Sequence, residues 1–145
     1  MRETLAIGLT HIQPLKVGNG LTVPALSHAF TGFADMPPVF ATAFMVALVE
    51  WSCVEALRPH LEPHEHSVGT RVDVQHLSPT PVGMTATAKV VLTGIEGRML
   101  KFEVSCFDDL DEIGKGVHER AIIDKPRFLR RVAERAAQAG VGTQA

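Results

Sequence analysis

The chain has 145 residues, of which 46% are hydrophobic and 21% are charged, and its formal net charge is −2. Such values are typical of one globular domain with a small core, and they exclude a wholly disordered chain and a fibrous repeat. The nearly balanced charge gives no electrostatic reason to expect a nucleic-acid partner. We therefore expect residues 1–145 to fold as a single domain.

The chain shows no pattern typical of membrane insertion or export. Its longest apolar run, residues 37–49, is interrupted by Thr42 and closed by Glu50, and it is shorter than the roughly 20 residues of a spanning helix. The N-terminus lacks the charged-then-apolar layout of a signal peptide. The two cysteines, Cys53 and Cys106, lie far apart without metal-type spacing. We expect two reduced, buried thiols in a cytoplasmic protein with no membrane partner.

The first part of the chain predicts short strands and turns. Residues 10–17 suit one strand, and Gly18-Asn19-Gly20 is a strong turn signal. Residues 21–23 are then expected to pair back across the turn until Pro24 ends the run.

One long helix dominates the prediction. Asp35 suits its N-cap, Pro37 and Pro38 suit its first turn, and Pro59 stops it. Its apolar residues form one stripe at helical spacing that is expected to face a sheet: Ala43, Val46, Ala47, Cys53, Val54 and Leu57.

The segments after the helix alternate apolar and polar residues with the period of two that marks a strand. Strands are expected over residues 70–76, 85–92, 100–106 and 114–123. Their short turns favour an antiparallel meander. Pro126 opens a short basic helix that ends near Gly140, so residues 126–145 are expected to form a helix and tail. A long helix followed by a meander is an α+β arrangement.

Glu50 is the most informative residue. It lies on the apolar side of the central helix, between Val46 and Val54 at i−4 and i+4. A carboxylate there costs free energy unless a partner pairs with it or its pKa rises, and a raised pKa is what a general base near neutral pH needs. The alternative is a glutamate that ends the apolar face and reaches solvent at a groove.

His76 shares a strand face with Val72 and Val74, which is the face that the helix is expected to cover. A lone inward histidine is usually a core residue with its hydrogen bonds satisfied. Opposite an inward Glu50, however, each group sets the protonation state of the other.

Thr42 interrupts the apolar run near the start of the helix. Its hydroxyl either bonds back to a helical carbonyl or lies beside a substrate. It is eight residues from Glu50, which is about 12 Å along a regular helix, so the two cannot touch within one straight helix. Either a substrate and His76 bridge them, or the site takes them from two subunits.

Arg120 and His118 share one face of the last strand. An inward Arg120 needs an anion, which is either a ligand or a protein carboxylate such as Glu50 or Glu103. Gly69 precedes a predicted strand, where the missing side chain either lets a ligand approach the backbone or only serves a turn.

Two further groups of residues carry weaker signals. His60, His64 and His66 have a metal-like spacing, but Glu62 and Glu65 beside them fit a solvated loop, and we expect no metal. The chain has no glycine-rich phosphate loop and no nucleophile elbow. The last helix is basic, and its charged face is either solvated or meets a phosphorylated ligand: Lys125, Arg127, Arg130, Arg131 and Arg135.

Several motifs, in the same order, resemble the fluoroacetyl-CoA thioesterase family, whose members have the hotdog fold. The resemblance covers roughly residues 33–124, and the stretch from Val39 to Val54 is similar to the central helix of that family. The other motifs are Leu61-Glu62-Pro63, Ser67-Val68-Gly69-Thr70, Thr80-Pro81, Val82-Gly83, Glu96-Gly97-Arg98, Asp111-Glu112-Ile113-Gly114 and His118-Glu119-Arg120-Ala121.

The resemblance implies an antiparallel sheet wrapped around one long helix, and hydrolysis of an acyl-CoA without a metal or cofactor. It implies a catalytic trio of Thr42, Glu50 and His76, with Gly69 and Arg120 contacting the substrate. It also implies a homodimer or a dimer of dimers with active sites at the subunit interface.

The lid over the acyl group departs from the family pattern. Phe33 fits one aromatic lid position, but the second position holds Met36, which is flexible and fills space loosely. We therefore expect a thioesterase for a short acyl-CoA, which need not be fluoroacetyl-CoA. Two alternatives stay open, namely a non-catalytic acyl-CoA-binding hotdog protein and an enoyl-thioester hydratase, although the helix shows no acid–histidine pair that matches a hydratase.

Overall fold

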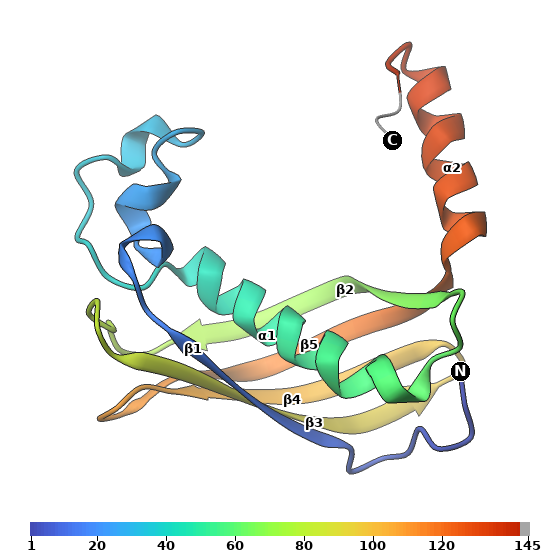
Figure 1. Cartoon of the computed structure of the whole chain (residues 1–145), viewed down its shortest axis with the longest axis horizontal. Helices are drawn as coiled ribbons and strands as arrows, with labels where there is room; N and C mark the ends of the chain where they lie inside the picture. The colour runs from blue at the N-terminus through green and yellow to red at the C-terminus, as the bar shows by residue number, and fades with distance from the viewer. Residues whose placement is uncertain (143–145) are drawn as a thin grey trace.

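A five-stranded antiparallel sheet wraps one long helix in the computed structural model, which describes residues 1–142 (Figure 1). The strands are β1 (Thr10–Lys16), β2 (Glu65–His76), β3 (Thr85–Glu96), β4 (Met99–Phe107) and β5 (Glu112–Asp124). Helix α1 (Thr42–Leu57) lies against the concave face of the sheet, and helix α2 (Lys125–Gln138) follows β5 and stands away from it. The predicted α+β arrangement is confirmed.

The order of the strands across the sheet is β1-β3-β4-β5-β2. The expected meander is confirmed for β3, β4 and β5, but β2 pairs with β5 instead of with β3. Residues 77–84 connect β2, at one edge of the sheet, to β3. They form a longer loop than the tight turn that would pair β2 with β3. Pro79 and Pro81 have no N–H to offer a neighbouring strand, and the Thr80 carbonyl accepts a hydrogen bond from Phe40 N at 2.9 Å.

Helix α1 begins at Thr42, so the predicted start near Asp35 is wrong. Residues 37–41 lie outside the helix. Val39 and Phe40 form isolated β-bridges, and Ala41, whose backbone is extended, donates its N–H to Leu21 O at 3.0 Å. A residue that precedes proline is disfavoured in the helical region, and both residues 36 and 37 precede one. At the other end, Arg58–His60 form a 3-10 turn, so Pro59 ends the helix as predicted.

The buried face of α1 also differs from the predicted stripe. Within that stripe Cys53 and Leu57 are buried, but Ala43 and Ala47 are exposed. The face that packs on the sheet consists of Met45, Leu48, Val49, Ser52, Cys53, Ala56 and Leu57. Since α1 is apolar almost all round, its periodicity does not decide which side faces the sheet.

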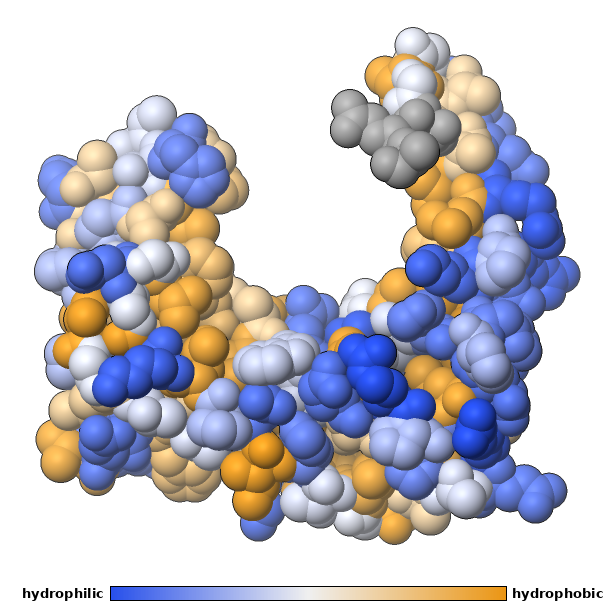
Figure 2. Space-filling view, viewed as in Figure 1, coloured by the Kyte–Doolittle hydropathy of each residue, from blue (hydrophilic) through white to orange (hydrophobic). Residues whose placement is uncertain are grey.

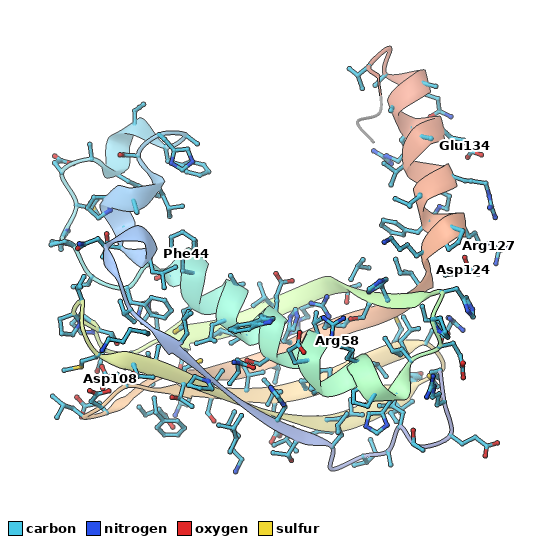
Figure 3. The ribbon with its side chains drawn as sticks, in the orientation of Figure 1. Phe44, Arg58, Asp108, Asp124, Arg127 and Glu134 are labelled. Carbon is cyan, nitrogen blue, oxygen red and sulfur yellow. The ribbon has the colours of Figure 1, made fainter. Side chains whose placement is uncertain are left out.

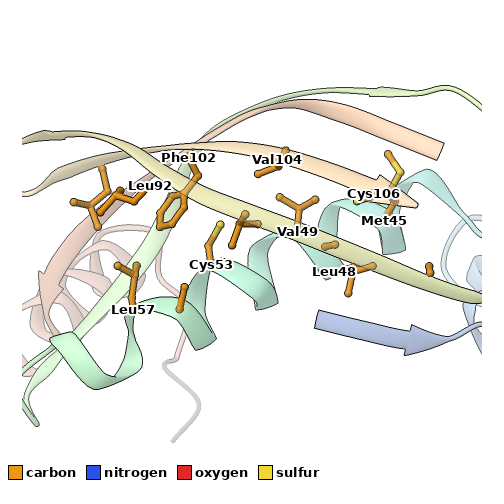
Figure 4. Packing of buried hydrophobic residues seen from close by; sticks show 14 of the residues in the cluster. Met45, Leu48, Val49, Cys53, Leu57, Leu92, Phe102, Val104 and Cys106 are labelled. Atoms are coloured by element: carbon orange, nitrogen blue, oxygen red, sulfur yellow. The ribbon is translucent and has the colours of Figure 1, made fainter. Parts of the chain in front are cut away.

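The core lies between α1 and the sheet (Figure 4). Fully buried side chains of α1, such as Met45 and Leu57, face Leu92, Phe102 and Cys106 from β3 and β4. Both cysteines are free thiols in this core. Burying each such aliphatic or aromatic side chain contributes about 1.5–3 kcal/mol to the stability of the fold, and this packing fixes α1 on the sheet.

Residues 19–38 form a separate lobe, here called the N-terminal lobe, above the start of α1 (Figure 1). It is built from the 3-10 turns Asn19–Leu21, Val23–Leu26 and Thr31–Phe33. The predicted pairing of residues 21–23 back onto the first strand is wrong, because Thr22 bridges Phe40 instead. That bridge joins the lobe to the segment before α1.

The C-terminal basic helix is confirmed as α2. The Asp124 side chain caps it by accepting a hydrogen bond from Arg127 N at 3.0 Å, and Pro126 lies in its first turn. None of its residues, all of which the structure describes, is buried. Over residues 1–142 no helix is long and apolar enough to cross a membrane.

Candidate functional site

The residues singled out from the sequence lie in two clusters along the outer side of α1. Thr42 and His76 form a pair at the start of the helix. Two turns later a second group surrounds Glu50, and it is called here the Glu50 cluster: Glu50, Ser67, Gly69, His118 and Arg120.

The Thr42–His76 pair is a short side-chain hydrogen bond. Thr42 Oγ1 lies 2.7 Å from His76 Nδ1. Thr42 is the first residue of α1 and His76 the last residue of β2. The backbone on both sides is tied down, since Phe40 N donates to Thr80 O and Leu77 N donates to Ile113 O at 2.7 Å. The pair is therefore held by two elements that the sheet positions.

His76 is set up as a neutral imidazole. Burial lowers its pKa, and the Ser78 backbone beside it opposes this to a smaller degree. Its Nε2 is the one buried side-chain nitrogen or oxygen that has no hydrogen-bond partner among residues 1–142. A buried polar atom of this kind normally has a partner, so the described chain by itself leaves Nε2 unsatisfied.

A cavity of about 310 Å³ lies over this pair. Its wall is largely apolar, with Val23, Val39 and Phe40 on one side and Leu77 and Pro79 on the other. Phe33 and Met36 do not line it, although both are partly exposed in the N-terminal lobe, where the Phe33 ring lies 5.7 Å from that of Phe30. The proposed lid role of Phe33 and Met36 stays a prediction.

In the Glu50 cluster the arginine is buried, whereas the carboxylate that it pairs with is partly exposed to solvent. Arg120 Nη1 lies 3.3 Å from Glu50 Oε1, and their side chains are 6% and 44% exposed respectively. Of the partners that the sequence allowed for Arg120, the structure places Glu50 there. A buried guanidinium thus holds one carboxylate oxygen and leaves the other side of Glu50 accessible.

Arg120 is itself held from three directions. Its Nε donates to Ser67 Oγ at 2.8 Å, its Nη2 donates to Ser67 O at 2.9 Å, and its Nη1 lies 3.1 Å from His118 Nε2. With every guanidinium nitrogen engaged, the group cannot follow a displaced carboxylate, and its charge is fixed in place.

His118 completes this arrangement as a neutral acceptor. Its Nδ1 lies 2.7 Å from Arg71 O, and a carbonyl only accepts, so Nδ1 carries the proton and Nε2 accepts from Arg120. Burial, and to a smaller degree the Arg120 charge, lower the pKa of His118, whereas the bond to Arg71 O raises it. His118 therefore positions Arg120 without adding a second positive charge.

Gly69 makes room for the Glu50 carboxylate. A Cβ on Gly69 would collide with Glu50 Oε1 and would lie 3.3 Å from His118 Cε1. The residue lies at a β-bulge, where the pairing of β2 with β5 shifts between Gly69 and Arg71. The structure thus gives Gly69 a reason to lack a side chain, and its contact with a substrate stays a prediction.

Within one chain the structure does not bring Glu50 and His76 together. His76 pairs with Thr42, and the histidine beside Glu50 is His118, at 3.9 Å. The signal for His118 was present, because it shares a face of β5 with Arg120. Ser67 carried no comparable signal, since its contact depends on the pairing of β2 with β5.

The acidic residues around the histidine cluster differ from the sequence interpretation. Glu65 was expected in a solvated loop, but it is the first residue of β2 and is buried, with its Oε2 2.6 Å from Arg98 Nη2. Over residues 1–142 no group of three or more histidine, cysteine or acidic side chains is arranged to hold a metal ion.

Comparisons with known proteins agree with this fold. A family model described as fluoroacetyl-CoA-specific thioesterase matches residues 23–126. The fluoroacetyl-CoA thioesterase of Streptantibioticus cattleyicolor is 42% identical over 135 residues, which cover 93% of this chain and 97% of the relative.

Two solved structures are also similar. A single-residue variant of a fluoroacetyl-CoA-specific thioesterase, solved with fluoroacetate and CoA, matches with a TM-score of 0.83 and 44% identity over 86% of this chain and 99% of that one. A hot-dog-like protein from Thermanaerovibrio acidaminovorans has a TM-score of 0.77 at 23% identity over 90% and 93% of the two chains, which bears on the fold alone. The predicted hotdog fold is confirmed.

Proposed function

Because the chain belongs to the fluoroacetyl-CoA-specific thioesterase family and is a thioester hydrolase, we propose that it hydrolyses a short acyl-CoA through Thr42, Glu50 and His76. The observation that carries the proposal is the position of Glu50, a half-exposed carboxylate fixed by a buried arginine. Such a group is both oriented and reachable, which a nucleophile or general base requires.

Glu50 supplies the attack on the thioester in this scheme. Its contacts with residues 1–142 engage Oε1, which faces Arg120 and His118. The other oxygen either attacks the carbonyl carbon directly or takes a proton from the water that attacks. In the first case the C–S bond breaks as a mixed anhydride forms on Glu50, and water then hydrolyses the anhydride to the product carboxylate and free Glu50. In the second case the water oxygen bonds to the carbonyl carbon as the C–S bond breaks. In both cases the CoA thiolate gains a proton.

The Thr42–His76 pair supplies hydrogen bonds and a proton at the other side of the thioester. A neutral His76 whose Nδ1 is bound to Thr42 presents Nε2 to the entering group. Nε2 then orients the reacting atoms and carries a proton to the departing sulfur. No metal or cofactor takes part in this scheme.

A second copy of the chain brings the two clusters together. Thr42 and Glu50 are eight residues apart on one continuous helix, or about 12 Å. The outer side of α1 is apolar, with Ala43, Ala47 and Trp51 exposed, and Figure 2 shows apolar surface facing the hollow between the N-terminal lobe and α2. A homodimer with a twofold axis across α1 would face Thr42 and His76 of one protomer with Glu50 of its partner.

The substrate is a short acyl thioester. The cavity of about 310 Å³ over the Thr42–His76 pair has apolar walls and suits a small acyl group. Met36 replaces a rigid ring with a flexible thioether, so we expect acyl groups other than fluoroacetyl to be accepted. Of the alternatives, the hydratase has no support in α1, which contains no histidine.

Thiol release from a panel of acyl-CoAs tests the proposal. The panel consists of acetyl-, fluoroacetyl-, propionyl-, butyryl-, phenylacetyl- and a long-chain acyl-CoA. We expect turnover of the short members and little of the long-chain one. If folded protein releases no thiol from any member but binds one of them in calorimetry, the hydrolase proposal is wrong and the non-catalytic alternative holds.

Replacement of Glu50 by glutamine tests the site itself. The amide keeps the shape of the side chain but loses its basicity, so kcat should fall by about 10²–10⁴-fold. The matched control is Glu55→Gln on the same helix, where Glu55 pairs with the exposed Arg58, and its kcat should be unchanged. Near-normal turnover by folded Glu50→Gln protein would remove Glu50 from the mechanism.

A further inference from the structure

Two adjoining cavities continue from the Glu50 cluster toward α2. The inner cavity, about 260 Å³, is bordered by Ser67, His66, Val54 and Arg58, and Ser67 is the residue that holds Arg120. The outer cavity, about 440 Å³, lies at the foot of α2. Both are bordered by Glu65, the first residue of β2.

The outer cavity carries positive charge that the described chain does not neutralise. It is bordered by Arg98, Arg127 and Arg131. Arg98 is paired with buried Glu65, but neither Arg127 nor Arg131 forms an ion pair with any of residues 1–142. These two arginines are one helical turn apart and therefore lie on the same face of α2.

The remaining charges at this cavity do not cancel the two arginines. Asp124 also borders it, but its carboxylate oxygen accepts the Arg127 backbone N–H as the cap of α2. Figure 3 shows Asp124 and Arg127 together at the foot of the helix, with Glu134 further along it. His64, the half-buried Phe128 and the apolar Ile122 and Ile123 also line this cavity.

The distance from Glu50 to this cavity matches one part of an acyl-CoA. Glu50 lies against Gly69, and His64, at the outer cavity, is five residues away along extended chain. At about 3.3 Å per residue this is about 17 Å. An extended pantetheine arm, which separates the thioester of CoA from its phosphates, has a length of this order.

We propose that the outer cavity binds the phosphorylated nucleotide end of CoA, with Arg127 and Arg131 on its phosphates and Phe128 against the adenine. Arginine pairs well with phosphate because its N–H groups match the phosphate oxygens, and an aromatic ring offers a stacking face to a base. The inner cavity then carries the pantetheine arm to Glu50. This assignment rests on the proposed acyl-CoA hydrolysis.

The test compares two double variants of the same helix. Arg127→Ala with Arg131→Ala removes both phosphate contacts, whereas Arg130→Ala with Arg135→Ala removes the same charge outside both cavities. All four side chains are exposed, so both proteins should fold, which thermal melting checks. KM and kcat are measured with an acyl-CoA and with the same acyl group on pantetheine, which lacks the nucleotide.

We expect the first double variant to raise KM for the acyl-CoA by about 10- to 100-fold with kcat kept, because two phosphate contacts are lost at an exposed surface where solvent weakens each of them. Its KM for the pantetheine thioester, and both values in the control, should stay within about threefold. An equal rise in both double variants, or no rise in either, would overturn the assignment while leaving the hydrolase proposal intact.

Calorimetry with adenosine 3′,5′-bisphosphate separates the two proposals, because it needs no turnover. Binding to the wild-type chain that is lost in Arg127→Ala with Arg131→Ala supports the nucleotide site, even if no acyl-CoA is hydrolysed. Binding that persists in that variant, or that inorganic phosphate displaces as well as the nucleotide does, counts against it.

Discussion

Arg120 and Glu50 show how a single buried charge organises the candidate site. The guanidinium is almost completely buried, and its contacts with Ser67, His118 and Glu50 satisfy it. Removing any one of them would leave a buried charge short of a partner, which is costly. The same contacts keep the Glu50 carboxylate facing one way, so stability and orientation have a common origin.

Gly69→Ala should disturb that orientation without unfolding the protein. The added methyl group occupies the space of Glu50 Oε1, and Glu50 can swing outward because its other side is open. A shift of about 1 Å in a catalytic group costs about 10²-fold in rate, so kcat should fall by that order. The control is Gly20→Ala, where the new methyl meets nothing within 4 Å. Unchanged kcat in Gly69→Ala would mean that the exact position of the Glu50 carboxylate does not matter for turnover.

His76 makes the activity depend on pH in a defined direction. Burial lowers its pKa below the ordinary 6.5, so the neutral ring persists above that pH and is lost as pH falls through the lowered value. Activity that needs neutral His76 should therefore be steady above about pH 6.5 and decline on the acid side. An NMR titration of the ring, assigned by comparison with His76→Gln, checks the cause. A midpoint at or above 6.5 would contradict it.

Among the elements, β2 is anchored by a buried carboxylate at its first residue. Glu65 pairs with Arg98 in the turn between β3 and β4, and its other oxygen lies 2.5 Å from the Met1 amino group. Burial alone would raise the pKa of Glu65, but the bonds from the Met1 amino group, the Glu62 amide and Arg98 outweigh it and lower the pKa to about 2. The anchor thus joins the start of β2 to the β3–β4 turn and to Met1.

This anchor predicts how stability changes in acid. The unfolded chain binds a proton at Glu65 near the ordinary pKa of 4.5 and the folded chain only near 2. The stabilisation is therefore complete above about pH 4.5 and is lost as pH falls toward 2. Urea unfolding between pH 7 and 3 should show this loss, and Glu65→Gln should be less stable at pH 7 with a flatter pH dependence. The control is Glu62→Gln, which removes a partly exposed carboxylate; an equal effect there would contradict the prediction.

The elements also show what the sequence could predict. The strands were predictable because alternation with period two reports a half-buried sheet directly. The buried face and first residue of α1 were not, because the helix is apolar on both sides and its start depends on bonds from Phe40 and Ala41 to distant carbonyls. For the site, Glu50 and Arg120 were indicated by their positions on apolar faces, and the family resemblance implied the same two residues. The contact of Ser67 with Arg120 depends on the pairing of β2 with β5, which the sequence did not predict. No local sequence pattern indicates the bulge at Gly69.

At the scale of the whole molecule, the separation of Thr42 and Glu50 predicts subunit complementation. If each site combines Thr42 of one protomer with Glu50 of its partner, chains with Thr42→Ala and chains with Glu50→Gln should restore activity when unfolded and refolded together. Half of the randomly formed dimers are mixed and each has one intact site, so about a quarter of wild-type activity should return. Turnover of the mixture that merely equals the average of the two variants would place the whole site within one chain.

The reactivity of the two cysteines reports whether the protein is folded. Both thiols are buried in the core, and burial raises the pKa of Cys53 to about 12 and that of Cys106 to about 11. The thiolate is the form that attacks a disulfide reagent, so neither residue should react while the core is folded. In a thioesterase assay, the colour that the reagent produces then measures only the CoA thiol released by hydrolysis. In a heated or urea-treated sample without substrate, the same reagent measures the fraction of unfolded protein, because each unfolded chain exposes two thiols.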